Sequence, residues 1–219
     1  MVYGGTMAGA TEGSRIGVHF RTFEDIALSL GCRLPEIIHT DGHKRASVAF
    51  VLRDGEAGME VLFIERASRD GDPWSGDLGF PGGRVEDGDG DPRRTAERET
   101  LEELGLDLSS ARCLGRLSDI VGAHLPVHVA CFVYGVGEVQ EFRLSDEVRD
   151  VFWVPLAELA APERQVTAAV RFGGEDFERP AISLPVEGKP VLWGITYRLV
   201  MQFLKVLAGP SAVQKCTAG

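Results

Sequence analysis

The sequence predicts an α/β fold of the α+β type, in which a mixed β-sheet is sandwiched between helices. After a short first helix, the expected elements follow the order β, β, α, β, β, β, α, and apolar residues of the helical runs recur at helical intervals. A chain of 219 residues is long enough for one sizeable domain and short for two. We therefore expect a single domain over residues 19–210, with flexible tails at 1–18 and 211–219.

The first half of the chain carries a helix and a pair of strands. A short amphipathic helix is predicted for residues 21–30, where apolar side chains recur at helical spacing. The runs ASVAFVLR (46–53) and MEVLFIER (59–66) are β-rich, and the DGEAG segment between them is typical of a turn. These runs are predicted to be adjacent strands joined by that turn.

A second helix is predicted for RRTAERETLEELGL (93–106), which consists largely of strong helix formers. Pro92 lies near its start, and Gly105 stands where a C-terminal stop is expected. Three of its residues are expected to face the core: Ala96, Leu101 and Leu104. The later elements are three strands and a last amphipathic helix, expected at 112–121, 126–136, 148–155 and 191–207.

The charge balance excludes some partners. Lys and Arg total 23 against 33 Asp and Glu, and the net charge of −10 argues against a surface that neutralises the phosphates of a long nucleic acid. No apolar run reaches the ~18 residues of a membrane span, and the first residues lack a basic flank followed by a hydrophobic stretch. We expect neither a nucleic-acid nor a membrane partner. We expect a cytoplasmic location.

Cysteine and histidine residues do not form a recognisable site. The four cysteines are far apart and include no CxxC pair, so reduced packing thiols are expected rather than a zinc site or a disulfide framework. His124 and His128 fall on one face of an expected strand. Without a third ligand, they are expected to satisfy local hydrogen bonds. The cysteines are Cys32, Cys113, Cys131 and Cys216.

The second predicted helix gathers carboxylates. Residues three and four apart share a helix face, so Glu99, Glu102 and Glu103 crowd their carboxylates onto one side. One interpretation is a solvated acidic face, with Arg98 and Glu102 as a surface pair. The other is a site for Mg²⁺ or Mn²⁺, which prefer oxygen ligands and are shared with substrate phosphates. A Gly-Gly loop ahead of the helix can bring the backbone close to such a site, which would suit the opening of a pyrophosphate.

This segment resembles a known motif. Gly83, Asp89 and the run RETLEELGL from Arg98 to Leu106 are similar to the Nudix box, G-x5-E-x7-R-E-U-x-E-E-x-G-U, where U is a bulky aliphatic residue. Five fixed positions of that run match, which for ordinary composition happens by chance on the order of once in a million windows. The chain is thus identified as resembling the Nudix family.

The segment departs from the pattern at three points, two in the loop of the box and one in the helix. One extra residue separates Asp89 from Arg98, Asp89 stands where the pattern has Glu, and Thr100 stands where it has an aliphatic residue. The role of Asp89 is therefore left open, with Glu86 as a competing loop carboxylate. Thr100 would cost some apolar burial if that position packs inward.

The resemblance implies the Nudix fold and a pyrophosphohydrolase that uses Mg²⁺ or Mn²⁺. The metal ligands would be Glu99, Glu102, Glu103 and the backbone of Gly83. Glu102 and Glu103 would also be catalytic, and Arg98 would orient a ligand carboxylate through a charge-assisted hydrogen bond. The general base would be one of these three glutamates or a carboxylate from a later loop, for which Glu147 is the candidate. The alternative for Glu147 is an ordinary exposed loop charge.

Two flanking segments are similar to the coenzyme A pyrophosphatase branch of that family. They are SGDLGFPGG (75–83) and LWGITYRLV (192–200), and the resemblance covers roughly residues 45–207. The branch has a basic residue where this chain has Asp72. The resemblance implies that coenzyme A or a derivative is cut at its diphosphate to 3′,5′-ADP and a 4′-phosphopantetheine.

Three residues near these segments are candidates for substrate binding: Arg66, Arg69 and Phe80. The two arginines could meet the 3′-phosphate, or they could be surface charges at a strand end. Two other functions stay open, which are a pyrophosphatase of ADP-ribose or other nucleoside diphosphate derivatives and a non-catalytic ligand-binding regulator of the same fold. The expected partner is a small nucleotide diphosphate substrate, and the chain could form a homodimer.

Overall fold

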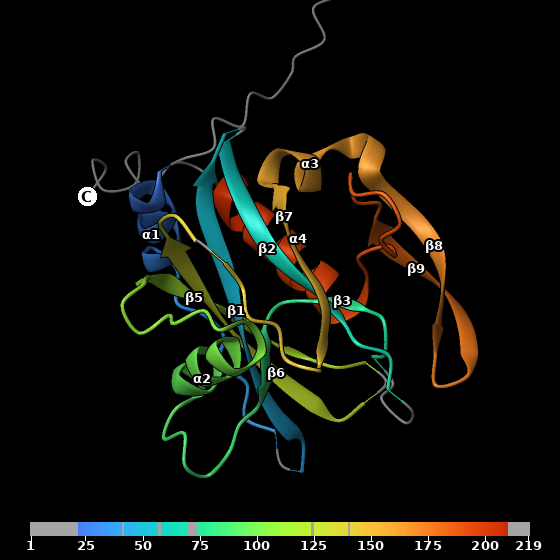
Figure 1. Cartoon of the computed structure of the whole chain (residues 1–219), viewed down its shortest axis with the longest axis horizontal. Helices are drawn as coiled ribbons and strands as arrows, with labels where there is room; N and C mark the ends of the chain where they lie inside the picture. Colours follow the sequence, from blue (N-terminus) through green and yellow to red (C-terminus); the bar gives the residue numbers. More distant parts are fainter. Residues whose placement is uncertain are drawn as a thin grey trace, which may run out of the picture.

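The computed structural model in Figure 1 describes residues 22–40, 42–56, 58–69, 74–123, 125–139 and 141–209. The expected tails at 1–18 and 211–219 lie outside the described residues, as do Asp72, His124 and Cys216. Within the described ranges, the chain forms a mixed β-sheet with helices on both faces (Figure 1). The predicted fold class is confirmed.

The main sheet is mixed because its central strand β1 pairs in both directions. β1 runs antiparallel to β2 and β4, and parallel to β6. Toward one edge of the sheet, β2 also pairs with β3 and β7, and toward the other edge β6 also pairs with β5. The strands are β1 (Lys44–Gly55), β2 (Gly58–Arg66), β3 (Leu78–Gly79), β4 (Gly82–Arg84), β5 (Arg112–Val121), β6 (Val127–Val136) and β7 (Val148–Pro155).

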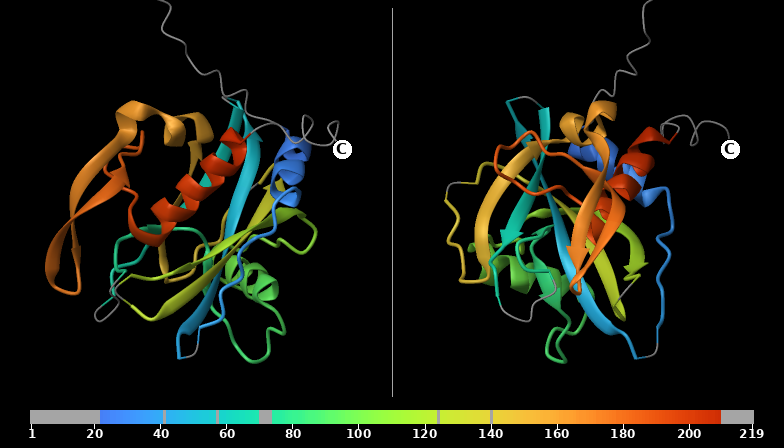
Figure 2. Two further views of the ribbon diagram at one scale, coloured as in Figure 1. Left: turned by 180° about the vertical axis from the view of Figure 1, so that it is seen from behind. Right: turned by 90° about the vertical axis from the view of Figure 1, so that its right-hand side faces the viewer.

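Two apolar cores lie on the two faces of this sheet, and alternate residues of β1 supply both. Phe50 and Leu52 belong to the core beneath α1 and α4, whereas Ala49 and Val51 belong to the core beneath α2. Successive side chains of a strand point to opposite faces, so a central strand covered on both sides is apolar throughout. Figure 2 shows these helices on the opposite sides of the sheet.

The helices are α1 (Phe23–Gly31), α2 (Pro92–Leu104), α3 (Leu156–Ala160), a 3₁₀ turn (Pro162–Arg164) and α4 (Gly194–Ala208). Within the described ranges, none of them is both long and apolar enough to cross a membrane.

Helix α2 begins and ends as its sequence predicts. The Asp91 side chain accepts hydrogen bonds from two backbone N–H groups of the first turn, Pro92 occupies that turn, and Gly105 caps the end at a φ of 67°. One expectation is wrong: Leu101 is 49% exposed. Thr100 occupies the buried face instead, where its hydroxyl donates to the carbonyl of Ala96 at 2.6 Å.

A hairpin between residues 165 and 182 was not expected from the sequence. Strands β8 (Gln165–Phe172) and β9 (Glu175–Ile182) pair with each other in a separate two-stranded sheet, joined by Gly173 and Gly174 at positive φ. Figure 2 shows this hairpin standing out from the main sheet on the side of α4. A two-residue Gly-Gly connection between β-rich runs is a hairpin signal, so the sequence did contain the information.

Candidate active site

A cleft of about 980 Å³ opens on the face of the sheet that carries α4. Its floor consists of alternate residues of two neighbouring strands, Ala46 and Val48 in β1 and Val127 and Val129 in β6. Its walls include the carboxylates of α2, the first turn of α4, and the β8–β9 hairpin. The cleft therefore collects residues that are far apart in the sequence.

The Gly82–Gly83 pair lets the carboxylates of α2 approach the sheet. A Cβ on Gly82 would lie 2.3 Å from the carbonyl oxygen of Ser47, and one on Gly83 would lie 2.3 Å from the carboxyl carbon of Glu99. Gly82 also has a φ of 150°, which L side chains rarely adopt. Strand β4 is therefore held between β1 and α2, where a side chain at either glycine would collide with its neighbours.

Glu103 is the most deeply buried of the three glutamates, with 3% of its surface exposed. Its Oε2 accepts a hydrogen bond from the backbone N–H of Gly82 at 2.9 Å. Burial raises the pKa of Glu103 to about 8. The nearby Glu99 and Glu147 carboxylates add to this rise, while the Gly82 N–H and Arg66 oppose it. Burial also raises the pKa of Glu99.

Asp89 has a defined position that its sequence left open. Its carboxylate accepts from Nε of Arg98 at 2.8 Å, from Nη2 of Arg98 at 3.1 Å and from the hydroxyl of Thr95 at 2.8 Å. The backbone N–H of Glu86 donates to it as well, and the exposed Glu86 side chain lines the cleft. The hydrogen bond from Arg98 is the largest cause that holds the pKa of Asp89 below its usual range.

Arg98, held in this way, reaches two of the glutamates. Its Nη1 lies 3.0 Å from Oε1 of Glu99 and 2.9 Å from Oε2 of Glu102. Asp89 on one side and two glutamates on the other therefore fix the guanidinium. The role of Arg98 in orienting metal-binding carboxylates stays a prediction.

The remaining sequence candidates are not equally placed. Glu147 and Arg66 line the cleft, whereas Arg69 forms an ion pair with Glu147 at 2.8 Å, with both side chains about half exposed. Phe80 also lines the cleft but is 5% exposed. Its ring lies 4.5 Å from that of Phe50, so its larger contribution is to the core.

A hydrogen bond joins the two flanking segments at the cleft. The indole Nε1 of Trp193, the residue before α4, donates to Oδ1 of Asp77 at 2.9 Å. An aromatic row extends from there, because the Phe172 ring lies 6.0 Å from Trp193 and 6.4 Å from Trp74. The Asp77 contact joins positions 116 residues apart, and sequence spacing alone gave no signal for it.

The expected roles of cysteine and histidine can be followed for the described residues. Cys32, Cys113 and Cys131 are free thiols. His128 is buried with its Nε2 at 2.7 Å from Oδ2 of Asp119, a local hydrogen bond of the expected kind.

Candidate metal ligands at the cleft are oxygen atoms. Glu99, Glu102, Glu103 and the Gly83 carbonyl offer the donors that Mg²⁺ and Mn²⁺ prefer. In the described part of the chain, no group of three or more His, Cys, Asp or Glu side chains is already arranged as a metal site. Arg98 contacts Glu99 and Glu102, and the Gly82 N–H donates to Glu103.

Comparison with known proteins gives three findings. The NUDIX domain family model matches residues 43–172. A mitochondrial coenzyme A diphosphatase of Homo sapiens is 32% identical over 162 residues, which cover 73% of this chain and 67% of the relative. An uncharacterized protein of Schizosaccharomyces pombe is 30% identical over 194 residues, covering 71% of this chain, and the chain spans 58% of that relative's length.

A solved structure shares the fold. The NUDIX domain of Shewanella oneidensis NrtR, complexed with ADP ribose, has a TM-score of 0.52 at 17% identity. The match covers 77% of this chain and 91% of that chain.

Proposed function

The chain belongs to the Nudix hydrolase family, and we propose on this premise that it hydrolyses the diphosphate of coenzyme A or a derivative with the help of Mg²⁺ or Mn²⁺. The products would be 3′,5′-ADP and a 4′-phosphopantetheine. The observation that carries the proposal is the cluster of Glu99, Glu102 and Glu103, packed against Gly82–Gly83 at the edge of the cleft. The coenzyme A diphosphatase relative supports the choice of substrate.

The carboxylate cluster fits a divalent cation by its chemistry. When bound, such a cation neutralises phosphate oxygens and lowers the pKa of a coordinated water. A nearby cation also favours the ionised form of a carboxyl group, which would offset the raised pKa values of Glu99 and Glu103. Glu99 and Glu102 each contact Arg98 Nη1 through one carboxylate oxygen, so the other oxygen of each would be the donor to the cation.

The surrounding residues would position the ligands and the reacting water. Asp89 holds Arg98, so that the guanidinium limits the orientations of Glu99 and Glu102. Glu147 remains the candidate general base. To accept a proton it would have to exchange its ion pair with Arg69 for a hydrogen bond to water.

The cleft suits a nucleotide-derived substrate in size and lining. Its volume of about 980 Å³ lies near the upper end of the usual range for small-molecule sites. The aromatic row formed by Trp74, Phe172 and Trp193 offers an apolar wall for a base or for the pantetheine chain. Arg66 and Arg69 remain candidates for phosphate contacts. A cytoplasmic location and a homodimer also remain predictions.

The test is a substrate panel. Purified protein is incubated with coenzyme A, ADP-ribose, NADH and dinucleoside polyphosphates, with Mg²⁺ and Mn²⁺ in separate reactions, and the products are resolved by chromatography. We expect coenzyme A to be turned over fastest. Clear turnover of another compound with none of coenzyme A would contradict the substrate assignment, and no turnover of any of them would favour a ligand-binding regulator.

A further inference from the structure

Two basic residues, Lys44 and Arg84, line the cleft next to the carboxylate cluster. Arg84 directly follows Gly83 and pairs with Ala46 across β4 and β1, and Lys44 stands two residues before Ala46. Residues two apart on a strand share a face, so both side chains belong to the face that forms the cleft floor. Diagonal neighbours of this kind lie about 7–8 Å apart, near enough for two long side chains to meet at one anion.

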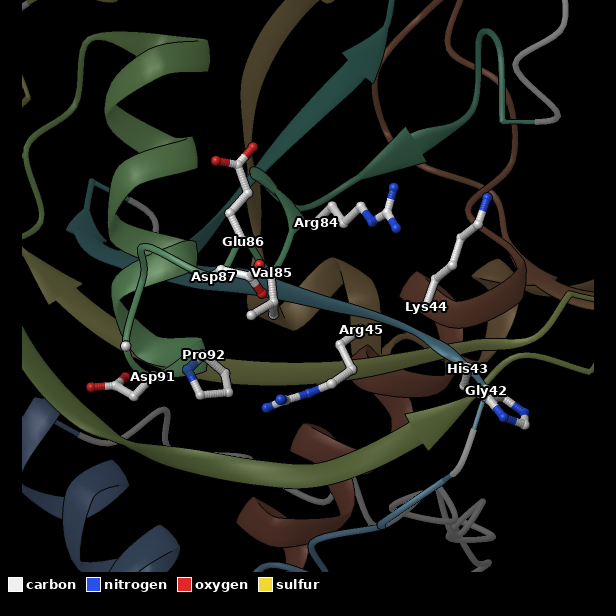
Figure 3. A pocket seen from close by; sticks show the side chains of 11 residues that line it. Gly42, His43, Lys44, Arg45, Arg84, Val85, Glu86, Asp87, Asp91 and Pro92 are labelled. Atoms are coloured by element: carbon white, nitrogen blue, oxygen red, sulfur yellow. The ribbon is translucent and has the colours of Figure 1, made fainter.

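A smaller cavity of about 510 Å³ adjoins the cleft and shares both residues with it. Figure 3 shows Lys44 and Arg84 extending toward the same side of this cavity, whereas Arg45 extends the other way, toward Pro92. The separation follows from the alternation of β1, since Arg45 lies between residues of the cleft face. The pair Lys44–Arg84 is therefore directed to one region.

The side chains of this pair have no bonded partner among the described residues. Both side chains are exposed, and neither forms an ion pair or hydrogen bond with any residue in the ranges that the structure describes. Other arginines at or near the cleft are engaged: Arg69 with Glu147, Arg98 with Asp89, and Arg198 with the carbonyl of Val121. Unlike these three, Lys44 and Arg84 have side-chain donors that no described residue occupies, so a ligand could accept from them.

From this placement we propose that Lys44 and Arg84 form an anion subsite for a phosphate group of the substrate that is not cleaved. The inference rests on the proposed function, in which that group is the 3′-phosphate of coenzyme A. The reacting diphosphate would lie at the carboxylates, one ribose ring away. Gly83 pairs with Ser47, and Lys44 lies three residues, about 10 Å, further along β1, which leaves room for such a ring between the carboxylates and the ends of the long Lys44 and Arg84 side chains.

The chemistry of the two residues suits a phosphate monoester. A guanidinium can donate two parallel hydrogen bonds to phosphate oxygens, and an ammonium adds a compact positive charge. Because both groups are exposed, salt will screen them, and their contribution will be a preference between ligands more than a large affinity. The subsite would thus distinguish substrates that carry a third phosphate from those that do not.

The experiment compares two ligands that differ only in this group. Binding of adenosine 3′,5′-bisphosphate and of AMP is measured by calorimetry in the presence of a chelator, for the wild-type chain and for the variant Lys44→Ala/Arg84→Ala. We expect the wild-type chain to prefer the bisphosphate by about tenfold or more, and the variant to lose most of this preference while its AMP affinity is unchanged. The preference of the wild-type chain should also fall as salt is raised.

A matched control removes two positive charges elsewhere. Arg112→Ala/Lys205→Ala changes two exposed residues that line neither cavity, and the preference should persist. Arg84→Lys in the otherwise unchanged chain should retain part of it. Circular dichroism of each variant checks that the fold is intact.

Three results would overturn the subsite: equal binding of both ligands by the wild-type chain, a preference that survives in Lys44→Ala/Arg84→Ala, or an equal loss of AMP affinity. The last would place the pair at the 5′-phosphate. Because the assay needs no turnover, failure of coenzyme A hydrolysis would leave this result standing. Conversely, hydrolysis with an unaltered preference would remove the subsite alone.

Discussion

Two arginines meet at the glycine pair and differ in what surrounds them. Nη2 of Arg98 donates to the backbone carbonyl of Arg84 at 3.3 Å, so the two residues are neighbours. The Arg98 guanidinium contacts the carboxylates of Asp89, Glu99 and Glu102. The Arg84 side chain is exposed and forms no ion pair within the described ranges.

The difference separates two uses of a positive charge. A guanidinium surrounded by carboxylates fixes the geometry of acidic groups. One that faces a cleft without a protein partner can exchange water for an anionic ligand. The cleft therefore has a carboxylate end, which we expect to carry the chemistry, and a cationic end, which we expect to select the substrate.

The largest expected effect is at the carboxylate end. Glu103→Gln keeps the shape of the side chain but removes its charge, and we expect Mg²⁺-dependent turnover to fall at least about 100-fold. Steady-state kinetics measures the loss, and circular dichroism checks the fold. Glu97→Gln on the same helix is the control, because Glu97 contacts Arg93 and Tyr134 rather than the cleft. Full residual activity of Glu103→Gln would overturn the assignment of Glu103.

The next largest effect is expected when Arg98 loses the charge of Asp89. Asp89→Asn removes the charge that holds Arg98, so turnover should fall by about 10- to 100-fold, and the free energy of unfolding should fall by about 1–3 kcal/mol. Steady-state kinetics measures the turnover, and urea denaturation measures the free energy of unfolding. Unchanged turnover in a stably folded Asp89→Asn would mean that Arg98 needs no such support.

This stability difference should depend on pH in a defined direction. The pKa of Asp89 is lower in the folded chain than its ordinary value of 3.8. A depressed carboxyl pKa contributes stability that is fully present above the unfolded value and is lost as pH falls toward the folded one. The wild-type chain and Asp89→Asn should therefore differ by a constant amount near neutrality, and the difference should shrink below about pH 4. A difference that grows in acid would contradict the charge-based explanation.

A smaller effect is expected where the two flanking segments meet. Trp193→Phe keeps the aromatic ring but removes the hydrogen bond to Asp77, so stability should fall by about 0.5–1.5 kcal/mol. KM for coenzyme A should rise more than kcat falls, because the bond fixes a wall of the cleft rather than the carboxylates. Asp77→Ala combined with Trp193→Phe should be less harmful than the sum of the single changes. If the stability losses of the two single changes simply added up in the double variant, Asp77 and Trp193 would not be energetically coupled.

The smallest effect concerns an exposed ion pair. It tests whether burial, rather than the length of the bond, decides how much an arginine ion pair contributes to the free energy of unfolding. Arg112 and Glu24 lie 2.6 Å apart, and their side chains are 49% and 64% exposed. Arg112→Ala should change the free energy of unfolding by less than about 0.5 kcal/mol, measured beside Asp89→Asn. A loss of stability as large as that of Asp89→Asn would show that exposed and partly buried arginine ion pairs do not differ in this chain.

Much of the fold could be predicted from local patterns. The apolar strands and α2 were predicted because their signals lie within one segment, such as Pro92 and Gly105 at the two ends of α2. Leu101 was misjudged because helical spacing alone does not say which stripe meets the sheet, and the buried stripe runs through Thr100. The β8–β9 hairpin was missed although its Gly173–Gly174 turn was readable.

The candidate site also has a part that local sequence predicts and a part that it does not. The carboxylates of α2 were predictable because one helix turn brings them together. The position of Asp89 was not, since it depends on how the loop returns to Arg98. Lys44 and Arg84 gave no signal at all, because their meeting depends on the register of β1 with β4.

The most direct test of the proposed function is one product analysis of coenzyme A hydrolysis, with Mg²⁺ in one sample and a chelator in the other. We predict that 3′,5′-ADP and 4′-phosphopantetheine appear in equal amounts with Mg²⁺ and are not formed with the chelator. Intact coenzyme A in both samples, or equal product in both, would contradict a metal-dependent coenzyme A pyrophosphohydrolase.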